Sequence, residues 1–208
     1  MSCVGGTAIA VVAGNVAGAV SFQSLEARLR GPSCDCGVAR QAQRAQELTA
    51  RRWRVHPFAG QAGYRVGIDA AAAVFVHGGE PDAAPPPAMT GSHIDTPPPV
   101  GWLDAAFGVA AGPGVFDALD RLGARTQRPL DGVMWTNQQG LRFAPGLMGC
   151  VAYTALVRLA VFLRGCDSEG RRFKAARDAA VRDLRAEAQQ QGGAVGQPID
   201  RARCAGQR

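Results

Sequence analysis

The chain has 208 residues, a mass of 21.7 kDa and a formal net charge of +6. Its 47% hydrophobic and 19% charged residues are typical of a soluble globular chain of one or two domains, which excludes disorder over the whole length. The positive charge is almost entirely arginine spread along the sequence, because Lys174 is the only lysine. With aromatic residues at only 6%, no basic stacking surface is indicated, and we expect no nucleic-acid partner.

The six cysteines are scattered along the chain, so they do not form the framework of a small disulfide-rich secreted domain. They favour a reducing compartment, and we expect a cytoplasmic protein. Cys34 and Cys36 form a C-x-C pair without a second pair or a nearby histidine, which is too little for a complete zinc site.

Residues 1–25 are uncharged and apolar, but they lack the positive start of an export signal and hold too many glycines for a membrane span. A strand or a loosely ordered segment is favoured there, and no membrane association is expected.

The first predicted element is an amphipathic surface helix over residues 38–55, where apolar side chains recur at helical spacing between arginines and glutamines. Residues 64–77 predict two short strands or a hairpin interrupted at an alanine run. Residues 78–87 combine glycines and prolines and predict a loop.

A strand, a helix and a second strand follow in succession. Residues 88–95 predict a short buried strand that ends in polar residues, and residues 130–136 predict another. Between them, residues 104–122 have helical apolar spacing, but Pro113 lies in the middle, where proline costs about 3 kcal/mol, so we expect a kinked or split helix. This order favours a parallel βαβ crossover and an α/β fold.

The C-terminal part of the sequence predicts two more helices, over residues 147–163 and 171–191. The second is rich in arginine with acidic residues between, which is typical of a solvated helix face. We expect the tail beyond residue 191 to be loosely ordered.

Polar side chains follow both strands of the crossover, at the edge where parallel α/β sheets usually place their sites. His93 is followed two residues later by Asp95, a carboxylate that can orient its imidazole, and Asp104 can share a cation with that ring. The alternative is that His93 and Asp95 close the strand and cap the next turn. The second strand ends in Thr136-Asn-Gln-Gln-Gly140.

Three motifs carry a family resemblance: MTGSHIDT at residues 89–96, GWLDAAFGV at 101–109, and VMWTNQQGLRFAP at 133–145 followed by Met148-Gly149. With their continuous spacing, they resemble the dinuclear zinc amidohydrolases that include N-carbamoyl-L-amino acid hydrolase, beta-ureidopropionase and allantoate amidohydrolase, whose pattern runs GSHxDT, GGxFDGxxGV and WTNEEGxRFxPxxxGS. The resemblance covers about residues 48–176. It implies a partial zinc-peptidase-like catalytic domain, with a largely parallel or mixed sheet flanked by helices and without the lid and dimerisation domain.

The resemblance also implies roles for single residues. His93 corresponds to a metal ligand, Asp95 to the catalytic carboxylate that orients it, and Asp104 to the carboxylate that bridges two divalent ions, Zn or Mn. Gln138 stands at the position of the general base, and Gln139 at that of a further metal ligand. Both are glutamate in the family pattern.

These two glutamines weaken the implied chemistry. An amide has no basic site near neutral pH, and the loss of a general base costs about 10² to 10⁴ in rate. Gln139 offers a metal only a neutral oxygen. The family's later histidine ligands come from parts of a longer chain, and His56 and His77 match no motif and are expected at the surface or at strand ends. Since catalytic zinc usually has three protein ligands, we expect impaired metal binding.

The resemblance therefore implies a metal-dependent hydrolase of linear amide bonds in N-carbamoyl amino acids or ureido compounds, with little or no activity as an isolated chain. The alternative is an inactive truncated relic or an interaction subunit of such an enzyme. The partner would be a small N-carbamoyl or ureido substrate, and the family homodimer is not expected without the lid domain. The predicted organisation is an apolar Gly-rich segment at 1–37, the partial catalytic domain at 38–176, and an Arg-rich helix with a loose tail at 177–208.

Overall fold

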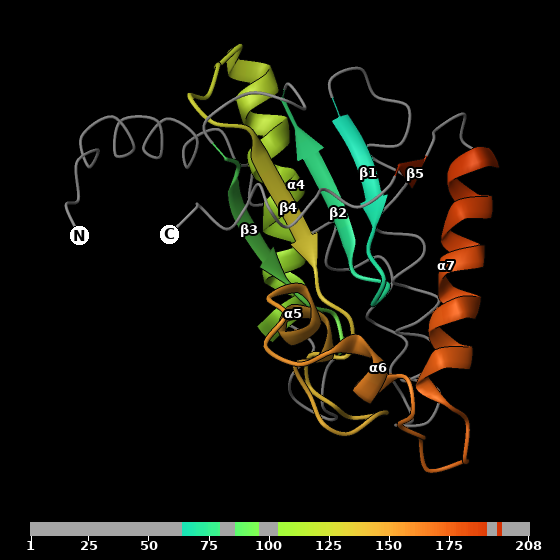
Figure 1. Ribbon diagram of the computed structural model, residues 1–208. Helices are drawn as coiled ribbons and strands as arrows, with labels where there is room; N and C mark the ends of the chain where they lie inside the picture. The colour runs from blue at the N-terminus through green and yellow to red at the C-terminus, as the bar shows by residue number, and fades with distance from the viewer. Residues whose placement is uncertain (1–63, 80–85, 96–103, 191–194, 197–208) are drawn as a thin grey trace.

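The computed structural model describes residues 64–79, 86–95, 104–190 and 195–196 (Figure 1). The predicted helix at 38–55, the N-terminal segment, Cys34, Cys36 and His56 lie outside the described residues. Five strands form one sheet in the order β3-β4-β2-β1-β5. The strands are β1 (Tyr64–Ile68), β2 (Val74–Gly78), β3 (Ala88–Ser92), β4 (Leu130–Met134) and β5 (Val195–Gly196), and the helices are α4 (Asp104–Leu122), α5 (Met148–Tyr153), α6 (Leu159–Phe162) and α7 (Phe173–Gln190).

Strands β1 and β2 form the expected hairpin, with antiparallel pairing from Tyr64↔Gly78 to Ile68↔Val74. The Asp69 carboxylate closes its turn, because Oδ1 accepts hydrogen bonds of 2.8 Å from the backbone N–H groups of both Ala71 and Ala73. An aspartate side chain bonded in this way replaces a backbone turn contact, which explains how the alanine run turns the chain.

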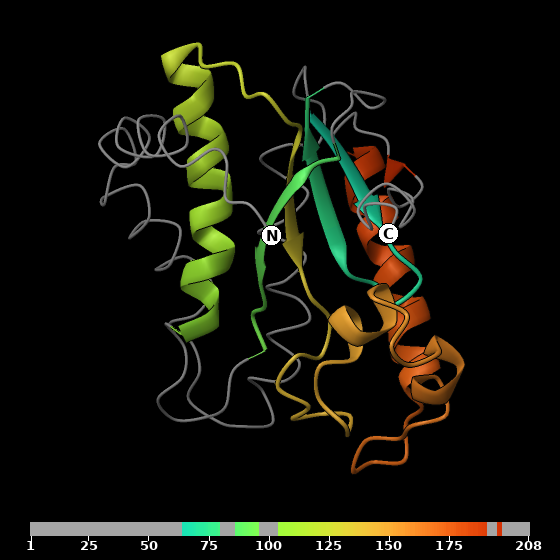
Figure 2. The same cartoon turned by 60° about the vertical axis from the view of Figure 1, so that its left-hand side comes forward.

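Strands β3 and β4 are parallel neighbours, and α4 connects them and runs alongside both (Figure 2). The predicted crossover is confirmed, and the sheet is mixed because β4 pairs antiparallel with β2. Of the expected kinked or split helix, the split is excluded, since α4 is one element of 19 residues that runs through Pro113. Burial of Phe116, Ala118 and Leu119 on the following turns holds the helix together, because tertiary packing outweighs a local propensity cost.

The expectation of a buried strand at residues 88–95 is also wrong in part. Ala88, Met89, Thr90 and Gly91 are exposed. The cause is the strand order, which places β3 at the edge of the described sheet, and an edge strand has a neighbour on one side only.

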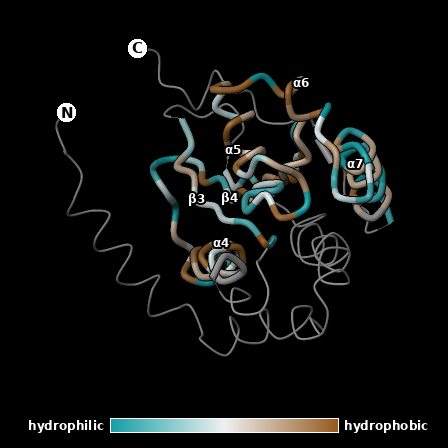
Figure 3. Tube along the Cα trace, turned by 90° about the horizontal axis from the view of Figure 1, so that it is seen from below, coloured by the Kyte–Doolittle hydropathy of each residue, from teal (hydrophilic) through white to brown (hydrophobic). Residues whose placement is uncertain are grey.

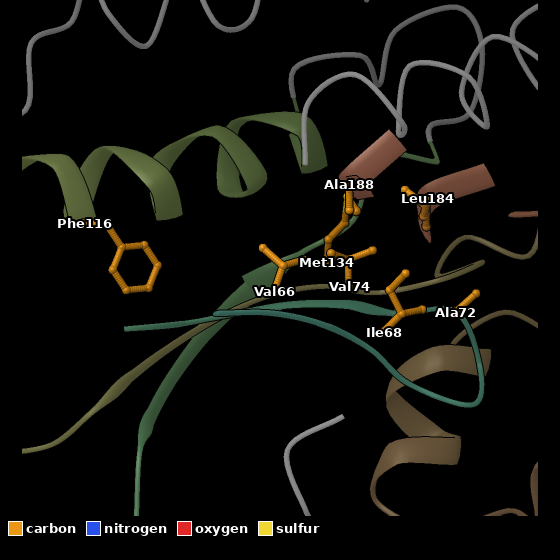
Figure 4. Close-up of a cluster of buried hydrophobic side chains, with 8 residues drawn as sticks. All are labelled: Val66, Ile68, Ala72, Val74, Phe116, Met134, Leu184 and Ala188. Carbon is orange, nitrogen blue, oxygen red and sulfur yellow. The ribbon is translucent and has the colours of Figure 1, made fainter. Parts of the chain in front are cut away.

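One face of the sheet carries the larger core. Phe116 of α4 and Leu184 and Ala188 of α7 pack over this face together with β-strand residues (Figure 4). The helix α4 comes close because Gly132 of β4 has no side chain, and a Cβ there would lie 3.1 Å from the Phe116 ring. The buried members of this core are Val66, Ile68, Ala72, Val74, Phe116, Met134, Leu184 and Ala188.

The opposite face of the sheet combines an aromatic cluster with a buried polar pair. Phe75 packs against Trp135 and Tyr153, with ring centroids 5.9 and 5.3 Å apart. His77, expected at the surface or at a strand end, is the penultimate residue of β2 but is only 2% exposed. It is buried together with Asp131, its direct partner on β4, which supplies a hydrogen-bond partner for its ring.

The C-terminal helices differ from expectation at one place. Residues 147–163 form two short helices, α5 and α6, because the chain turns between them with Ala155 at a φ of 58°. The long helix α7 is confirmed and carries many hydrophilic residues (Figure 3), including a Lys174–Asp178 ion pair of 2.6 Å. The tail is not loose throughout, since β5 pairs with β1. Among the described residues, no helix combines the length and apolar character needed to cross a membrane.

Candidate active site

The carboxyl ends of β3 and β4 meet at one edge of the sheet because the two strands are parallel neighbours. The pairing continues past β4, where the Trp135 N–H donates a 2.8 Å hydrogen bond to the Ser92 carbonyl. This contact places residues 93–95 beside residues 136–139. The two polar segments singled out in the sequence therefore share one site.

Asp95 connects these two segments. The His93 Nδ1–H donates to the Asp95 backbone carbonyl at 2.9 Å, and the same nitrogen lies 3.3 Å from Asp95 Oδ1. The other carboxylate oxygen, Oδ2, accepts a 2.6 Å hydrogen bond from the backbone N–H of Gln139. Both side chains are mostly buried, with His93 14% and Asp95 20% exposed. Asp95 thus fixes the ring orientation of His93 and the position of the next strand's loop at once.

The loop after β4 is held together by its own backbone and by Asn137. The Asn137 Nδ2 donates to the carbonyls of Phe143 and Pro145 at 2.7 and 3.3 Å. Asn137 has a φ of 50°, a left-handed conformation that asparagine tolerates better than most residues. At the far end of the loop, the Gly149 N–H donates to the Thr136 carbonyl at 3.0 Å.

Glycines make this close approach possible. A Cβ on Gly149 would lie 2.7 Å from the Thr136 backbone nitrogen, and one on Gly140 would lie 2.6 Å from the Gly146 nitrogen. The start of α5 and the two sides of the loop therefore pack backbone against backbone.

The side chains of Gln138 and Gln139 have different environments. Gln138 Nε2 contacts the Cys150 sulfur at 3.5 Å, while Gln138 Oε1 is buried and has no hydrogen-bond partner in the described part of the chain. Gln139 is exposed. Sequence analysis missed Cys150, although its place directly after Met148-Gly149, where the family motif has serine, is a signal that could have identified it.

Asp104 is the first residue of α4. One turn later, a Cβ on Gly108 would lie 2.6 Å from the Ser92 Cβ, so the start of α4 lies beside the end of β3. The helix backbone therefore brings Asp104 to the same edge of the sheet as His93 and Asp95, while its side chain lies outside the described part.

The described residues do not fit a centre for two divalent cations. They contain no group of three or more His, Cys, Asp or Glu side chains placed to hold a metal ion. The Nε2 group of Gln138 contacts the Cys150 sulfur, and both glutamines are uncharged. Two dications held by neutral amides lack the negative charge that offsets their own.

The chain is similar in sequence to amidohydrolases and in structure to amidases. It is 33% identical over 115 residues to an N-carbamoyl-L-amino-acid amidohydrolase of Rhizobium meliloti, a match that covers 54% of this chain and 27% of that protein. A hydantoinase/carbamoylase family amidase of Burkholderia ambifaria superposes with a TM-score of 0.61 at 32% identity, covering 80% of this chain and 40% of that one. The chain is thus similar in sequence and fold to part of a hydantoinase/carbamoylase family amidase.

A second amidohydrolase of the same name, from Geobacillus stearothermophilus, is also 33% identical over 115 residues. The chain spans 27% of the length of both N-carbamoyl-L-amino-acid amidohydrolases. No protein-family model matches the sequence. The relationship to the hydantoinase/carbamoylase amidases therefore rests on these pairwise matches and on the shared fold.

Proposed function

We propose that the chain carries part of the catalytic fold of a hydrolase for N-carbamoyl amino acids or ureido compounds and has little or no hydrolytic activity by itself. The named relatives support the substrate class. The observation that carries the proposal of inactivity is the pair Gln138 and Gln139, which stands on an ordered loop where a base and a ligand are expected.

The missing base is the first chemical reason. Hydrolysis of a linear amide needs a group that removes a proton from the attacking water, and an amide side chain has no site to take it. In addition, the Nε2 group of Gln138 contacts Cys150. A loss of about 10² to 10⁴ in rate is the expected consequence at this position alone.

The lack of charged cation ligands is the second chemical reason. His93 and Asp104 are the residues that would hold a Zn or Mn ion, which when bound supplies an activated water. Gln139 adds no charge to them, so we propose that cation binding by the chain is weak. The number and scatter of the six cysteines in the sequence support the proposal of a reducing, cytoplasmic location.

The test is hydrolysis of N-carbamoyl-L-amino acids and of linear ureido acids in excess zinc, manganese or cobalt. We expect the wild type to release no more product than a His93→Ala variant, with both samples shown to be folded by circular dichroism. Robust turnover that the His93→Ala substitution abolishes would contradict the proposal.

An interaction subunit is the second candidate, and the exposed edge of β3 favours it. Met89 and Thr90 lie exposed on this edge, and the strand carries no charge to discourage pairing. The partner is a polypeptide equivalent to the part of the Burkholderia ambifaria amidase that this chain does not cover. Co-expression with that part should give a co-purifying complex that a Met89→Pro substitution weakens, because alternate residues of β3 bond to β4 and the backbone of Met89 faces the free edge, and separate elution of the two would exclude this candidate.

A further inference from the structure

We infer that the amide side chains of Gln138 and Gln139, and not the backbone that carries them, weaken the binding of a divalent cation beside His93. The inference rests on the proposed function, in which this end of the sheet is a degenerate hydrolase site. It predicts that restoring two carboxylates tightens cation binding, because the loop backbone that would carry them is already held in place.

The backbone at both positions is fixed by groups that any residue provides. Gln139 contributes its backbone N–H, which donates to Asp95 Oδ2 at 2.6 Å. Gln138 contributes its backbone carbonyl, which accepts from the Leu147 N–H at 2.9 Å. Asn137, just before them, holds the rest of the loop through Phe143 and Pro145. A change of the 138 and 139 side chains therefore leaves these contacts intact.

Both positions also accommodate a glutamate. Glutamate has nearly the shape of glutamine, so the substitution exchanges an NH₂ group for an oxygen. At position 139 the side chain is exposed. At position 138 the exchange removes the 3.5 Å contact from Nε2 to the Cys150 sulfur, and Oε1 has no partner to lose among the described residues. Steric fit therefore does not explain why glutamine rather than glutamate occupies these two positions.

Charge is the property that changes. Two new carboxylates would lie on the loop whose backbone binds the Asp95 carboxylate, and like charges held close together repel one another until a cation or a proton neutralises them. Without metal, the Gln138→Glu/Gln139→Glu variant should therefore unfold at a lower temperature than the wild type. A divalent cation that binds only the folded state should then raise its unfolding temperature.

The experiment compares this double variant with a matched control that has the same change of charge elsewhere. Gln189 and Gln190 are adjacent and exposed at the end of α7, so Gln189→Glu/Gln190→Glu is the control. Metal content is measured after incubation with zinc or manganese and dialysis, and unfolding temperature is measured with and without the ion. We expect at least about tenfold tighter binding by the site variant than by the control. Adding His93→Ala to the site variant should remove the gain.

Two outcomes would overturn the inference. One is a folded site variant that binds no more cation than the control; the other is a wild type that already retains cations after dialysis. If the double variant fails to fold, the single Gln139→Glu variant, changed at an exposed position, is compared in the same way. Neither readout depends on turnover, so hydrolysis by the wild type would contradict the proposed function separately.

Discussion

The His77 imidazole and the Asp131 carboxylate form a buried pair at the centre of the sheet, with Nδ1 2.5 Å from Oδ1 and side chains 3% and 0% exposed. Each also has a buried polar atom, His77 Nε2 and Asp131 Oδ2, without a hydrogen-bond partner in the described part of the chain. The residues face each other directly across β2 and β4, which makes the pair a polar connection between two central strands.

Removing one member of this pair should cost more than removing both. We expect His77→Leu alone, or Asp131→Val alone, to lower the free energy of unfolding by about 3 kcal/mol, because a buried polar group loses its partner. The double substitution should recover much of that loss, since neither buried polar group is then left without the other. Urea unfolding of all four proteins measures this as a double-mutant cycle. Strictly additive losses would show that the pair is not coupled.

Gly91 should be intolerant of any side chain. A Cβ at this position would lie 2.2 Å from Val133 Cγ1 and 2.5 Å from the Val133 carbonyl oxygen, so Gly91→Ala should separate β3 from β4. A loss of more than about 2 kcal/mol in unfolding free energy is expected. Gly112→Ala in α4 is the matched control, because nothing lies within 4 Å of its Cβ. That substitution should change the unfolding free energy much less, because the better helix propensity of alanine is offset by the clash of its Cβ with the following Pro113, and equal losses at both positions would contradict the described packing.

Asn137 should control the order of the loop after β4. We expect Asn137→Ala to speed amide hydrogen exchange at residues 138–147, because it removes three side-chain hydrogen bonds and places alanine at a φ of 50°. Asn137→Gly should have an intermediate effect, since glycine tolerates the conformation but cannot make the bonds. Unchanged exchange in both variants would mean that the side chain does not hold the loop.

Asp167 should make stability depend on pH. Burial alone would raise the pKa of its carboxyl, but hydrogen bonds from the Arg171 backbone N–H and the Arg142 side chain lower the pKa below its ordinary value of 3.8. A group with a lowered folded-state pKa stabilises the protein above its unfolded pKa, and that contribution is lost as the pH falls through the folded value. Asp167→Asn should therefore destabilise the protein at neutral pH, and the difference from wild type should shrink below pH 3.8. Chemical unfolding over this pH range is the measurement, and a constant difference would contradict the role of Asp167.

Local patterns were sufficient for the parts of the fold that depend on neighbours in sequence. The hairpin of β1 and β2, the crossover of β3, α4 and β4, and the long helix α7 follow from periodicity and turn residues. The parallel crossover in turn brings the strand ends at His93 and Gln139 together, which is the main feature of the candidate site.

The rest depends on contacts between residues far apart in sequence. His77 is buried because the strand order places Asp131 opposite it, and neither residue's own neighbours indicate that register. The exposure of Met89 likewise follows from the edge position of β3. The continuity of α4 through Pro113 depends on packing of later turns such as that of Phe116, which no local propensity includes.

The pairing of β5 with β1 has a consequence for the order in which the chain assembles. Val195 pairs with Val66, so this part of the sheet closes a loop that includes almost all of the described chain. Closing so long a loop costs entropy that local elements do not incur, and such contacts form late in folding. On the ribosome, β1 therefore stays unpaired on its outer side until α7 and the segment after it have been synthesised.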